Sequence, residues 1–294
     1  MRMRPLEPSE LPTHAELQSV KSETTAPDLD AFITEVLHEA NLFMTDYHAK
    51  AFSVKRENQL AAPATAKVTL FARDIPVDEI PTTARTPGAS GIAETWFSRT
   101  SIHSNKREQG TADWDEFESG LLDNHSQNES EYAPDVYDAH KVLSWDESIG
   151  QIEGWRKVGM SIYEMAHKVP PPLNNRVFSV VVITARSSGD PSIFFVVQIP
   201  VDVSGVSKAL YSNARNKQDG DSAEKKKEVT MGQYVSIERC ELVDGGANVK
   251  WQMGTASDAK GALPMWVQKM AVPGTVIKDV SYFIDWLQKR RQGK

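Results

Sequence analysis

The sequence predicts an α+β protein in which a run of antiparallel strands packs against a C-terminal helix. From residue 136 to 255, apolar and polar residues alternate in the manner of strands. Apolar residues at helical spacing occur before this run, at 29–56, and after it, at 263–290. Successive strands without intervening helices favour antiparallel pairing over βαβ units. Such a sheet must bury one face, and the C-terminal helix is the large apolar element that remains to cover it.

The strands are predicted from period-two patterns that end at turn residues. Before the main run we expect a short strand at 67–73 and another at 94–103, separated by a proline-rich loop at 74–90. The main run predicts strands at 136–145, 154–167, 176–186, 192–202, 233–242 and 247–255. The last two form a hairpin, because Asp244-Gly245-Gly246 suits a tight turn between them.

The first two helices are indicated by acidic caps and apolar spacing. Asp28 and Asp30 suit the N-terminus of the helix at 29–56. Thr111 is expected to cap a second helix that turns its large apolar residues inward and its acids outward. The inward residues are Trp114, Phe117, Leu121 and Leu122, and the solvated ones are Asp113, Asp115, Glu116 and Glu118.

The C-terminal segment is predicted to consist of two helical pieces. Gly261 and Pro264 end the preceding strand and start the helix, since proline suits a first helical turn. Pro273-Gly274 then interrupts it. The second piece carries a clean apolar stripe formed by Val276, Val280, Phe283 and Leu287. Periodicity alone is equally satisfied by a helix that packs in a solid core.

One domain with two flexible segments is the simplest organisation. Residues 1–27 are rich in Pro, Glu, Ser and Thr and are expected to form a mobile leader. Residues 28–294 then form a single domain. A polar tract at about 204–228 is expected to be a disordered insertion between strands.

Composition excludes several classes of function. A net charge of −7 argues against sequence-independent nucleic-acid binding, which needs a basic footprint. Cys240 is the single cysteine, so no intramolecular disulfide or thiolate metal cluster is expected. Neither a secretory signal nor a membrane-length apolar run is visible. We therefore expect a soluble protein of the cytoplasm with no nucleic-acid partner.

Two segments resemble one known family. The first runs from Tyr163 to Phe178, Tyr-Glu-Met-Ala-His-Lys-Val-Pro-Pro-Pro-Leu-Asn-Asn-Arg-Val-Phe. The second runs from Asp258 to Trp266, Asp-Ala-Lys-Gly-Ala-Leu-Pro-Met-Trp. Both are similar to START (StAR-related lipid-transfer) domains, and the fuller sequence resembles a fungal branch called domain of unknown function 3074. The resemblance departs at Val177, where START domains often have Asp, so no salt bridge is expected from that position.

The resemblance implies a helix-grip fold, in which a curved antiparallel sheet wraps a long C-terminal helix and encloses a tunnel. It also implies that the proline-rich loop acts as a gate with the last helix. The expected gate residues are Pro170, Pro171, Pro172 and Leu173. Proline cannot donate to a sheet, so this loop stays outside the strand ladder.

The candidate ligand-binding residues are inward-facing polar groups and apolar residues of the last helix. Arg99, Ser101 and His103 share one strand face, although an ordinary hydrogen-bonded strand face explains them equally simply. An inward arginine, whether Arg99, Arg176 or Arg239, would suit a ligand hydroxyl or carboxylate. The expected ligand-binding set is Arg99, His103, Glu164, Arg176, Glu238, Leu263, Trp266, Met270, Val280 and Phe283.

No metal, cofactor or catalytic residue is predicted. Glu164 and His167 have the spacing of a helical metal site, but on a strand this spacing points them to opposite faces. The favoured function is a carrier or sensor of a lipid or sterol-like molecule, with transient contact to a membrane surface. The alternative is an enzyme, cyclase-like or other, that acts on a hydrophobic natural product and uses Arg99, His103 and Glu164. A third hypothesis is an interaction module built on 204–228.

Overall fold

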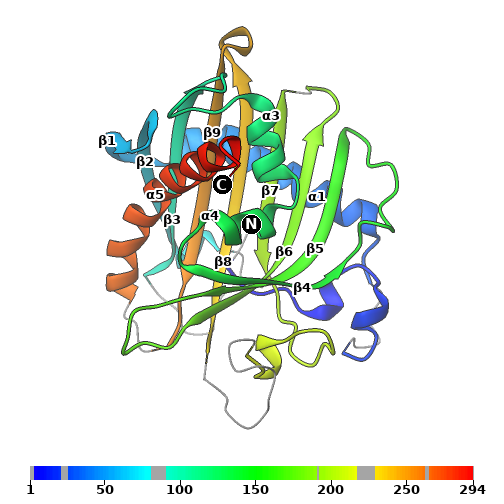
Figure 1. Ribbon diagram of the computed structural model, residues 1–294. Helices are drawn as coiled ribbons and strands as arrows, with labels where there is room; N and C mark the ends of the chain where they lie inside the picture. Colours follow the sequence, from blue (N-terminus) through cyan, green and yellow to red (C-terminus); the bar gives the residue numbers. More distant parts are fainter. Residues whose placement is uncertain are drawn as a thin grey trace.

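A computed structural model of the protein describes residues 3–20, 26–80, 91–190, 192–216, 229–261 and 265–293. The strands form one nine-stranded sheet in the order β1-β2-β3-β9-β8-β7-β6-β5-β4, with antiparallel neighbours. A short parallel contact also joins the beginnings of β6 and β8. Figure 1 shows the sheet curving around helix α5, which is the architecture expected of a helix-grip fold.

The bounds of the elements are as follows. The strands are β1 Ser53–Ala61, β2 Ala64–Pro76, β3 Ile92–Ser104, β4 Val136–Ser144, β5 Trp155–His167, β6 Arg176–Ser187, β7 Ile193–Pro200, β8 Thr230–Val243 and β9 Asn248–Asp258. The α-helices are α1 Leu29–Leu42, α2 His48–Ala51, α3 Trp114–Phe117, α4 His125–Tyr132 and α5 Met265–Arg291. Single π-helical turns occupy Phe43–Tyr47 and Glu118–Leu122. Short 3-10 turns lie at Pro8–Glu10, Ala15–Leu17, Val77–Glu79, Tyr211–Asn213 and Asp244–Gly246.

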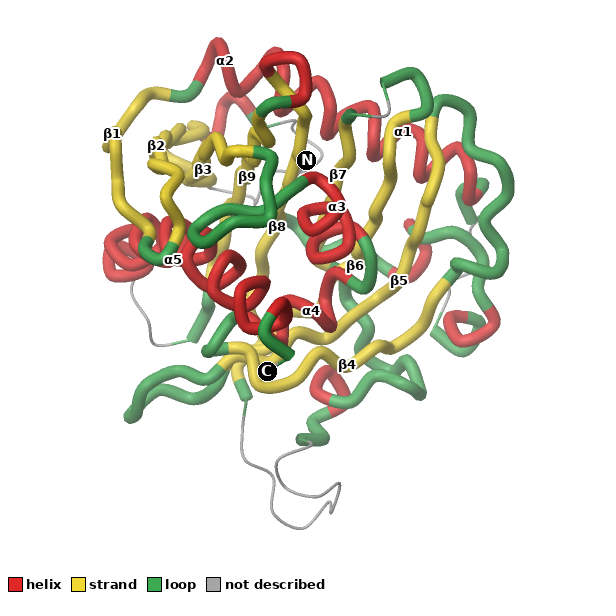
Figure 2. Tube along the Cα trace, turned by 45° about the horizontal axis from the view of Figure 1, so that its top comes forward, coloured by secondary structure: helices red, strands yellow, loops and turns green. Residues whose placement is uncertain are grey.

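The concave face of the sheet is covered by α3, α4 and α5 (Figure 2). An apolar core lies between these helices and the strands β2, β7, β8 and β9. Its centre is Phe283 of α5, whose ring lies 5.3 Å from that of Phe117 and 5.1 Å from that of Trp251. The predicted stripe of α5 therefore does face the sheet.

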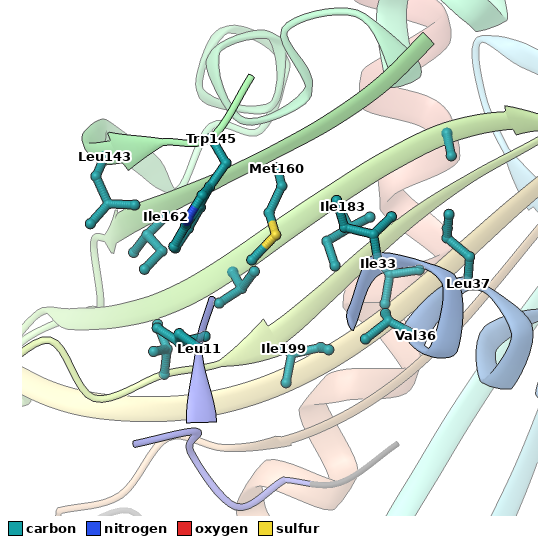
Figure 3. Close-up of a cluster of buried hydrophobic side chains, with 14 of the residues drawn as sticks. Leu11, Ile33, Val36, Leu37, Leu143, Trp145, Met160, Ile162, Ile183 and Ile199 are labelled. Atoms are coloured by element: carbon teal, nitrogen blue, oxygen red, sulfur yellow. The ribbon is translucent and has the colours of Figure 1, made fainter. Parts of the chain in front are cut away.

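The convex face carries a second core, which α1 covers. Figure 3 shows Ile33, Val36 and Leu37 of α1 beside Ile183 of β6 and Ile199 of β7. Helices from opposite ends of the chain thus cover the two faces, and the central strands are buried on both sides.

The N-terminal segment belongs to this convex core, which corrects the expectation of a mobile leader. Leu11 and Leu17 are fully buried. Leu6 pairs with Val201 as a short parallel bridge, and the indole N–H of Trp145 donates to the carbonyl of Thr13 at 3.0 Å. A few apolar residues in a polar tract were enough to anchor it.

The tract after β7 also differs from the expected disordered insertion. Residues 204–216 are described, whereas 217–228 lie outside the described residues. Within the described part, Val206, Ala209, Leu210 and Tyr211 are buried against the sheet. The segment folds because these apolar side chains pack against the convex face of the sheet.

The helix predictions need three corrections. The helix at 29–56 ends at Ala51, and residues from Ser53 form the edge strand β1. Asp113, and not Thr111, caps α3, and its carboxylate accepts from the amide of Glu116 at 3.0 Å. Helix α5 continues through Pro273 without interruption, since its neighbours still satisfy helical geometry.

Two acids expected in solvent are instead buried. Glu116 binds Arg291 of α5 at 2.6 Å, and Glu118 binds Arg186 of β6 at 2.8 Å. Each carboxylate can leave water because a guanidinium replaces the lost hydration. These two ion pairs connect the α3 region to the last helix and to the sheet.

We expect Gly120→Ala to destabilise the protein, because α5 approaches the π-helical turn closely at this glycine. A Cβ there would lie 2.6 Å from the ring of Phe283, which is fully buried and has no room to move. Overpacking of this kind costs about 1–3 kcal/mol. Chemical denaturation measures the loss. Gly189→Ala, where nothing lies within 4 Å, is the control and should change stability by less than about 0.5 kcal/mol.

Candidate functional site

A group of buried polar side chains lies on the concave face, between the sheet and the helices α4 and α5. Strand β3 contributes Arg99, Ser101 and His103, each 1% exposed. Their register partners on β9 include Met253 and Trp251, and Trp251 belongs to the core under α5. The three side chains thus share the inner face, as the strand pattern predicted.

Arg99, Trp251 and Glu238 form the first part of the site. The guanidinium of Arg99 lies over the Trp251 ring, 3.8 Å from its centroid. The indole N–H of Trp251 donates to the Glu238 carboxylate at 2.6 Å. Arg99 Nη2 is 3.9 Å from the same carboxylate, so the ion pair is loose. Arg99 Nε and Nη1 are buried and have no hydrogen-bond partner.

A directional hydrogen-bond chain forms the second part. The hydroxyl of Tyr234 donates to the side-chain oxygen of Gln198. The amide of Gln198 then donates to His125 Nε2 at 3.1 Å, and His125 Nδ1 donates to the carbonyl of Leu121 at 2.9 Å. This order assigns the proton of the neutral imidazole to Nδ1. Burial lowers the pKa of His125, which agrees with a neutral ring.

Two carboxyl groups next to this chain lack a strong partner. Glu129 Oε2 lies 3.7 Å from His125 Nε2, whose lone pair is already used by Gln198, and it has no hydrogen bond. Burial and the charges of Glu238 and Asp279 raise the pKa of Glu129 to about 8. Burial raises the pKa of Asp279 to about 7, against the opposing effect of Arg99. Glu129 therefore keeps its proton at pH 7, whereas Asp279 is about half protonated there.

Several residues around this site lie deep in the protein but are not fully covered by other atoms. Glu129 keeps 21% of its side-chain surface uncovered. Tyr132, Tyr234 and Asp279 are equally deep and also only partly covered. These partly covered side chains lie next to the buried polar group of β3 and β8.

A pocket of about 100 Å³ lies at the end of the sheet where β3 begins and β9 ends. Its lining includes the inner-face residues Thr95, Phe97 and Ser257, together with Lys269 and Val272 of α5. The gate loop follows the end of β5, and the antiparallel order of the strands brings it to this same end of the sheet.

The structure separates the predicted ligand-binding residues into groups. Arg99, His103 and Glu238 reach the concave interior, as do Val280 and Phe283. Val280 and Phe283 are completely covered, so they close the core beside the site and do not line open space. Burial lowers the pKa of His103 to about 3, and its ring packs 5.1 Å from that of Phe117. His103 is a neutral packing residue.

Glu164 does not belong to the site. Its side chain is on the convex face, where the carboxylate accepts from the backbone amides of Leu210, Tyr211 and Ser212 at 2.6, 3.1 and 2.7 Å. It fixes the segment that follows β7. The prediction was wrong because the phase of β5, which is buried on both faces, could not be read from its sequence.

Three candidates from the last helix have different outcomes. Met270 is 73% exposed and points away from the interior, so it does not form an apolar wall there. Leu263 lies outside the described residues. Trp266 is in the described part of α5, but its side chain is outside the description.

Arg176 connects the proline-rich loop to the segment that follows β9. Its Nη1 donates to the carbonyl of Asn174 in the loop, and its Nε donates to Ala259 at 2.6 Å. Nη2 is 3.4 Å from the carbonyl of Lys260. Pro170, Pro171 and Pro172 are exposed, and Leu173 is half-buried. Arg176 thus holds the proline-rich loop to the chain segment that leads from β9 toward α5.

Sequence reasoning missed the contribution of α4. His125, Glu129 and Tyr132 are spaced i, i+4 and i+7, so they share one helical face. The signal was present, but the segment is so polar that no element was predicted there. Asp279 was missed because an acid beside an apolar stripe is ordinarily solvated.

Other possible features of a site are absent from the described ranges. No group of three or more His, Cys, Asp or Glu side chains there could hold a metal ion. Within the same ranges, no helix combines the length and apolarity needed to cross a membrane.

Residues 96–287 match the model of a family described as "Protein of unknown function (DUF3074)". The match covers more than half of the chain. The chain belongs to this family. A curated relative, Uncharacterized protein C577.11 of Schizosaccharomyces pombe, is 31% identical over 140 residues, which are 44% of this chain and 51% of the relative. The chain therefore spans about half the length of that relative.

Solved structures show the same fold. Human STARD10 has a TM-score of 0.56 at 10% identity, over 93% of this chain and 85% of its own. Human StAR-related lipid transfer protein 5 has a TM-score of 0.55 at 11% identity, over 90% of this chain and 100% of its own. The fold of this DUF3074 protein is therefore the START-like helix-grip fold.

The raised pKa values of Glu129 and Asp279 predict that the contribution of these two carboxyls to stability falls as pH rises from 6.5 to 8. Both carboxyls keep their protons to higher pH when folded than when unfolded, where their ordinary values are 4.5 and 3.8. Unfolding then releases protons, so the free energy of unfolding decreases with pH. The buried histidines His48, His103, His125 and His167 have lowered pKa values, so between pH 6.5 and about 7.5 they add an opposing slope, which cancels when a variant is compared with wild type.

Denaturant unfolding of Glu129→Gln between pH 6.5 and 8.5 measures this effect. Relative to wild type, the stability of the variant should rise by about 1 kcal/mol or more between pH 6.5 and pH 8. Glu153→Gln, at an exposed position, should keep the wild-type slope. An unchanged slope in Glu129→Gln would show that Glu129 ionises normally in the folded protein.

Proposed function

We propose that this protein binds a hydrophobic small molecule, a lipid or a sterol-like compound, between the concave sheet face and α5. The observation that carries the proposal is the set of partly uncovered polar side chains deep in an otherwise apolar interior. A monomeric core normally satisfies such groups, so they favour a site that a ligand completes. The name of the similar StAR-related lipid transfer protein 5 supports the same class of ligand.

Its role would be that of a carrier or sensor rather than of a catalyst. Burial of apolar ligand surface supplies about 25 cal/mol per Å². Exchange requires the gate loop or the start of α5 to move. Exposed apolar side chains of Met231 and Met270 flank these elements and suit brief contact with a membrane surface. With a single buried cysteine, the protein also suits the reducing cytoplasm.

The enzyme hypothesis loses its original residues, since Glu164 is on the other face of the sheet from Arg99 and His103. One observation still favours it. Glu129, with its pKa raised to about 8, has the protonation behaviour of a general acid in an apolar cavity. Turnover of a bound hydrophobic compound that disappears in Glu129→Gln, while binding persists, would support this second function.

Native mass spectrometry of the protein as purified tests the binding function. We expect a hydrophobic adduct that organic solvent extracts. Met253→Trp should reduce adduct occupancy at least about tenfold, because Met253 lies between Arg99 and Glu238 and its partly uncovered side chain leaves room to fill. Leu60→Trp, at an exposed position of β1, is the control and should keep the adduct. A protein that is empty and binds no lipid or sterol from a broad panel would contradict the proposal.

Arg176→Met should accelerate ligand exchange. The substitution removes the guanidinium that holds Asn174, Ala259 and Lys260 together, at about 1 kcal/mol for each hydrogen bond. We expect the dissociation rate of a bound fluorescent lipid to rise about tenfold in stopped-flow transfer to acceptor vesicles. Arg156→Met, an exposed arginine of β5, is the control. An unchanged rate in Arg176→Met would exclude this tie from the exchange step.

A further inference from the structure

A polar pocket lies between helix α4 and the strands β4, β5 and β6. Its volume is about 480 Å³, which is within the range of small-molecule sites. The walls come from the first turn of α4, the π-helical turn before it, and the beginning of β5 with its neighbouring strands. None of the described residues of α5, β3 or β8 lines it. The pocket is therefore a second site, outside the space under α5.

The first turn of α4 presents backbone amides to this pocket. The helix has eight residues, and its N-cap Asn124 is left-handed, with φ at 50°, and makes no side-chain cap. Asn124, His125 and Ser126 all line the pocket. The first amides of a helix have no intrahelical acceptor, and the helix dipole adds a partial positive charge there. This end of α4 therefore suits an anion.

Ser126 gives a second and independent indication of a ligand. The residue is 1% exposed, and its hydroxyl has no hydrogen-bond partner among the described residues. A buried hydroxyl in a folded protein normally has a partner. Because Ser126 lines the pocket, an oxygen of a bound ligand would supply the acceptor that this hydroxyl lacks.

Two lysines bring positive charge to the strands of the pocket wall. The ammonium of Lys141 on β4 lies 5.5 Å from the centre of the Tyr163 ring, and both residues line the pocket. Lys157 of β5 is 3.0 Å from the carboxylate of Glu118. Arg186 already donates to both oxygens of that carboxylate, at 2.8 and 2.9 Å. One carboxylate thus faces two cations, which leaves positive charge for a ligand.

The chain holds both walls in place. Lys157 lies in a bulge of β5 and is left-handed, with φ at 49°. Bulges redirect side chains, and this lysine reaches the π-helical turn before α4. On the opposite wall, the side-chain amide of Asn128 donates to three carbonyls of that turn and of its end, at 2.8 to 3.1 Å. The binding groups are therefore positioned before any ligand arrives.

Two acids also line the pocket and restrict where an anion can lie. Asp146 uses Oδ1 to accept from the backbone amide of Met160 at 3.0 Å. Asp123 is exposed and comes directly before the N-cap of α4. An anion is therefore expected beside Ser126 and the lysines, and Asp123 should weaken its binding by repulsion.

We propose that this pocket binds a phosphate group, carried by a small soluble ester or by a lipid headgroup. The acceptor oxygens of a phosphate suffice for the α4 amides, the Ser126 hydroxyl and a lysine at the same time. The volume of the pocket leaves room for the organic part of an ester. The site goes beyond the proposed binding of a hydrophobic molecule under α5 and does not depend on it.

Calorimetric titration of the full chain with inorganic phosphate at pH 7.5 tests the site. We expect saturable binding of one phosphate, with Kd of about 1 mM or tighter. Lys141→Met should weaken binding about tenfold, because it removes a charge from the wall, and Asp123→Asn should strengthen it. Lys67→Met, at an exposed position of β2 outside the pocket, should leave it unchanged. Absence of saturable binding, or equal binding by wild type and Lys141→Met, would overturn the inference.

Ser126→Ala separates a binding role from a structural role. The variant should bind phosphate about fivefold more weakly, because a hydroxyl donor is lost. The thermal midpoint of the phosphate-free protein should stay the same or rise, since the hydroxyl has no partner there to lose. A lower midpoint with unchanged phosphate binding would show that the hydroxyl serves the fold, and would contradict the assignment.

Two further probes identify the source of the phosphate group. Glycerol 3-phosphate in solution represents a soluble ester, and vesicles of phosphatidylcholine with and without phosphatidic acid represent a lipid headgroup. Binding of either probe that weakens in Lys141→Met supports the site and assigns its source. Binding of both that persists unchanged in Lys141→Met and Ser126→Ala would overturn it. The hydrophobic adduct expected in native mass spectrometry is measured separately, so failure here leaves the proposed function intact.

Discussion

The sheet has a buried core on each face, so the phase of a strand determines which core receives each side chain. Along β8, Glu238 enters the concave interior, while its neighbour Arg239 faces the convex side and binds Glu241 at 2.5 Å. A register shift of one residue would exchange the two, placing an arginine where the carboxylate receives the indole of Trp251. The polar site therefore depends on strand register as much as on residue identity.

The fold class and most elements were predictable because their signals are local. Eight of the nine strands were expected near their observed positions, as was the apolar stripe of α5. Strand phase was harder, because β6 is buried on both faces and its run Val180-Val-Val-Ile183 shows no alternation. For the same reason, Glu164 was assigned to the wrong side while Arg99 and His103 were assigned correctly.

The N-terminal segment and the segment after β7 were predicted to be disordered for a different reason, their polar composition. Leu11 and Leu17 are separated by polar residues and prolines, yet both are fully buried against strands far along the chain. The segment after β7 is fixed by Glu164, which accepts three of its backbone amides. Neither interaction has a local sequence signal, because each partner is about 45 residues or more away in the chain. The polar composition of these two segments therefore predicted more disorder than the structure shows in their described parts.

Pro273 leaves one backbone hydrogen bond of α5 unmade, although the helix is continuous. Because proline has no amide hydrogen, the carbonyl of Lys269, one turn earlier, has no intrahelical donor. Beyond this point Val276, Val280 and Phe283 are anchored in the core, whereas Met270 is exposed to solvent. The helix is thus continuous but less firmly held before Pro273, where Lys269 pairs with Asp74 at 3.7 Å, than after it, where the core anchors it. A bend of the helix would therefore begin at this proline.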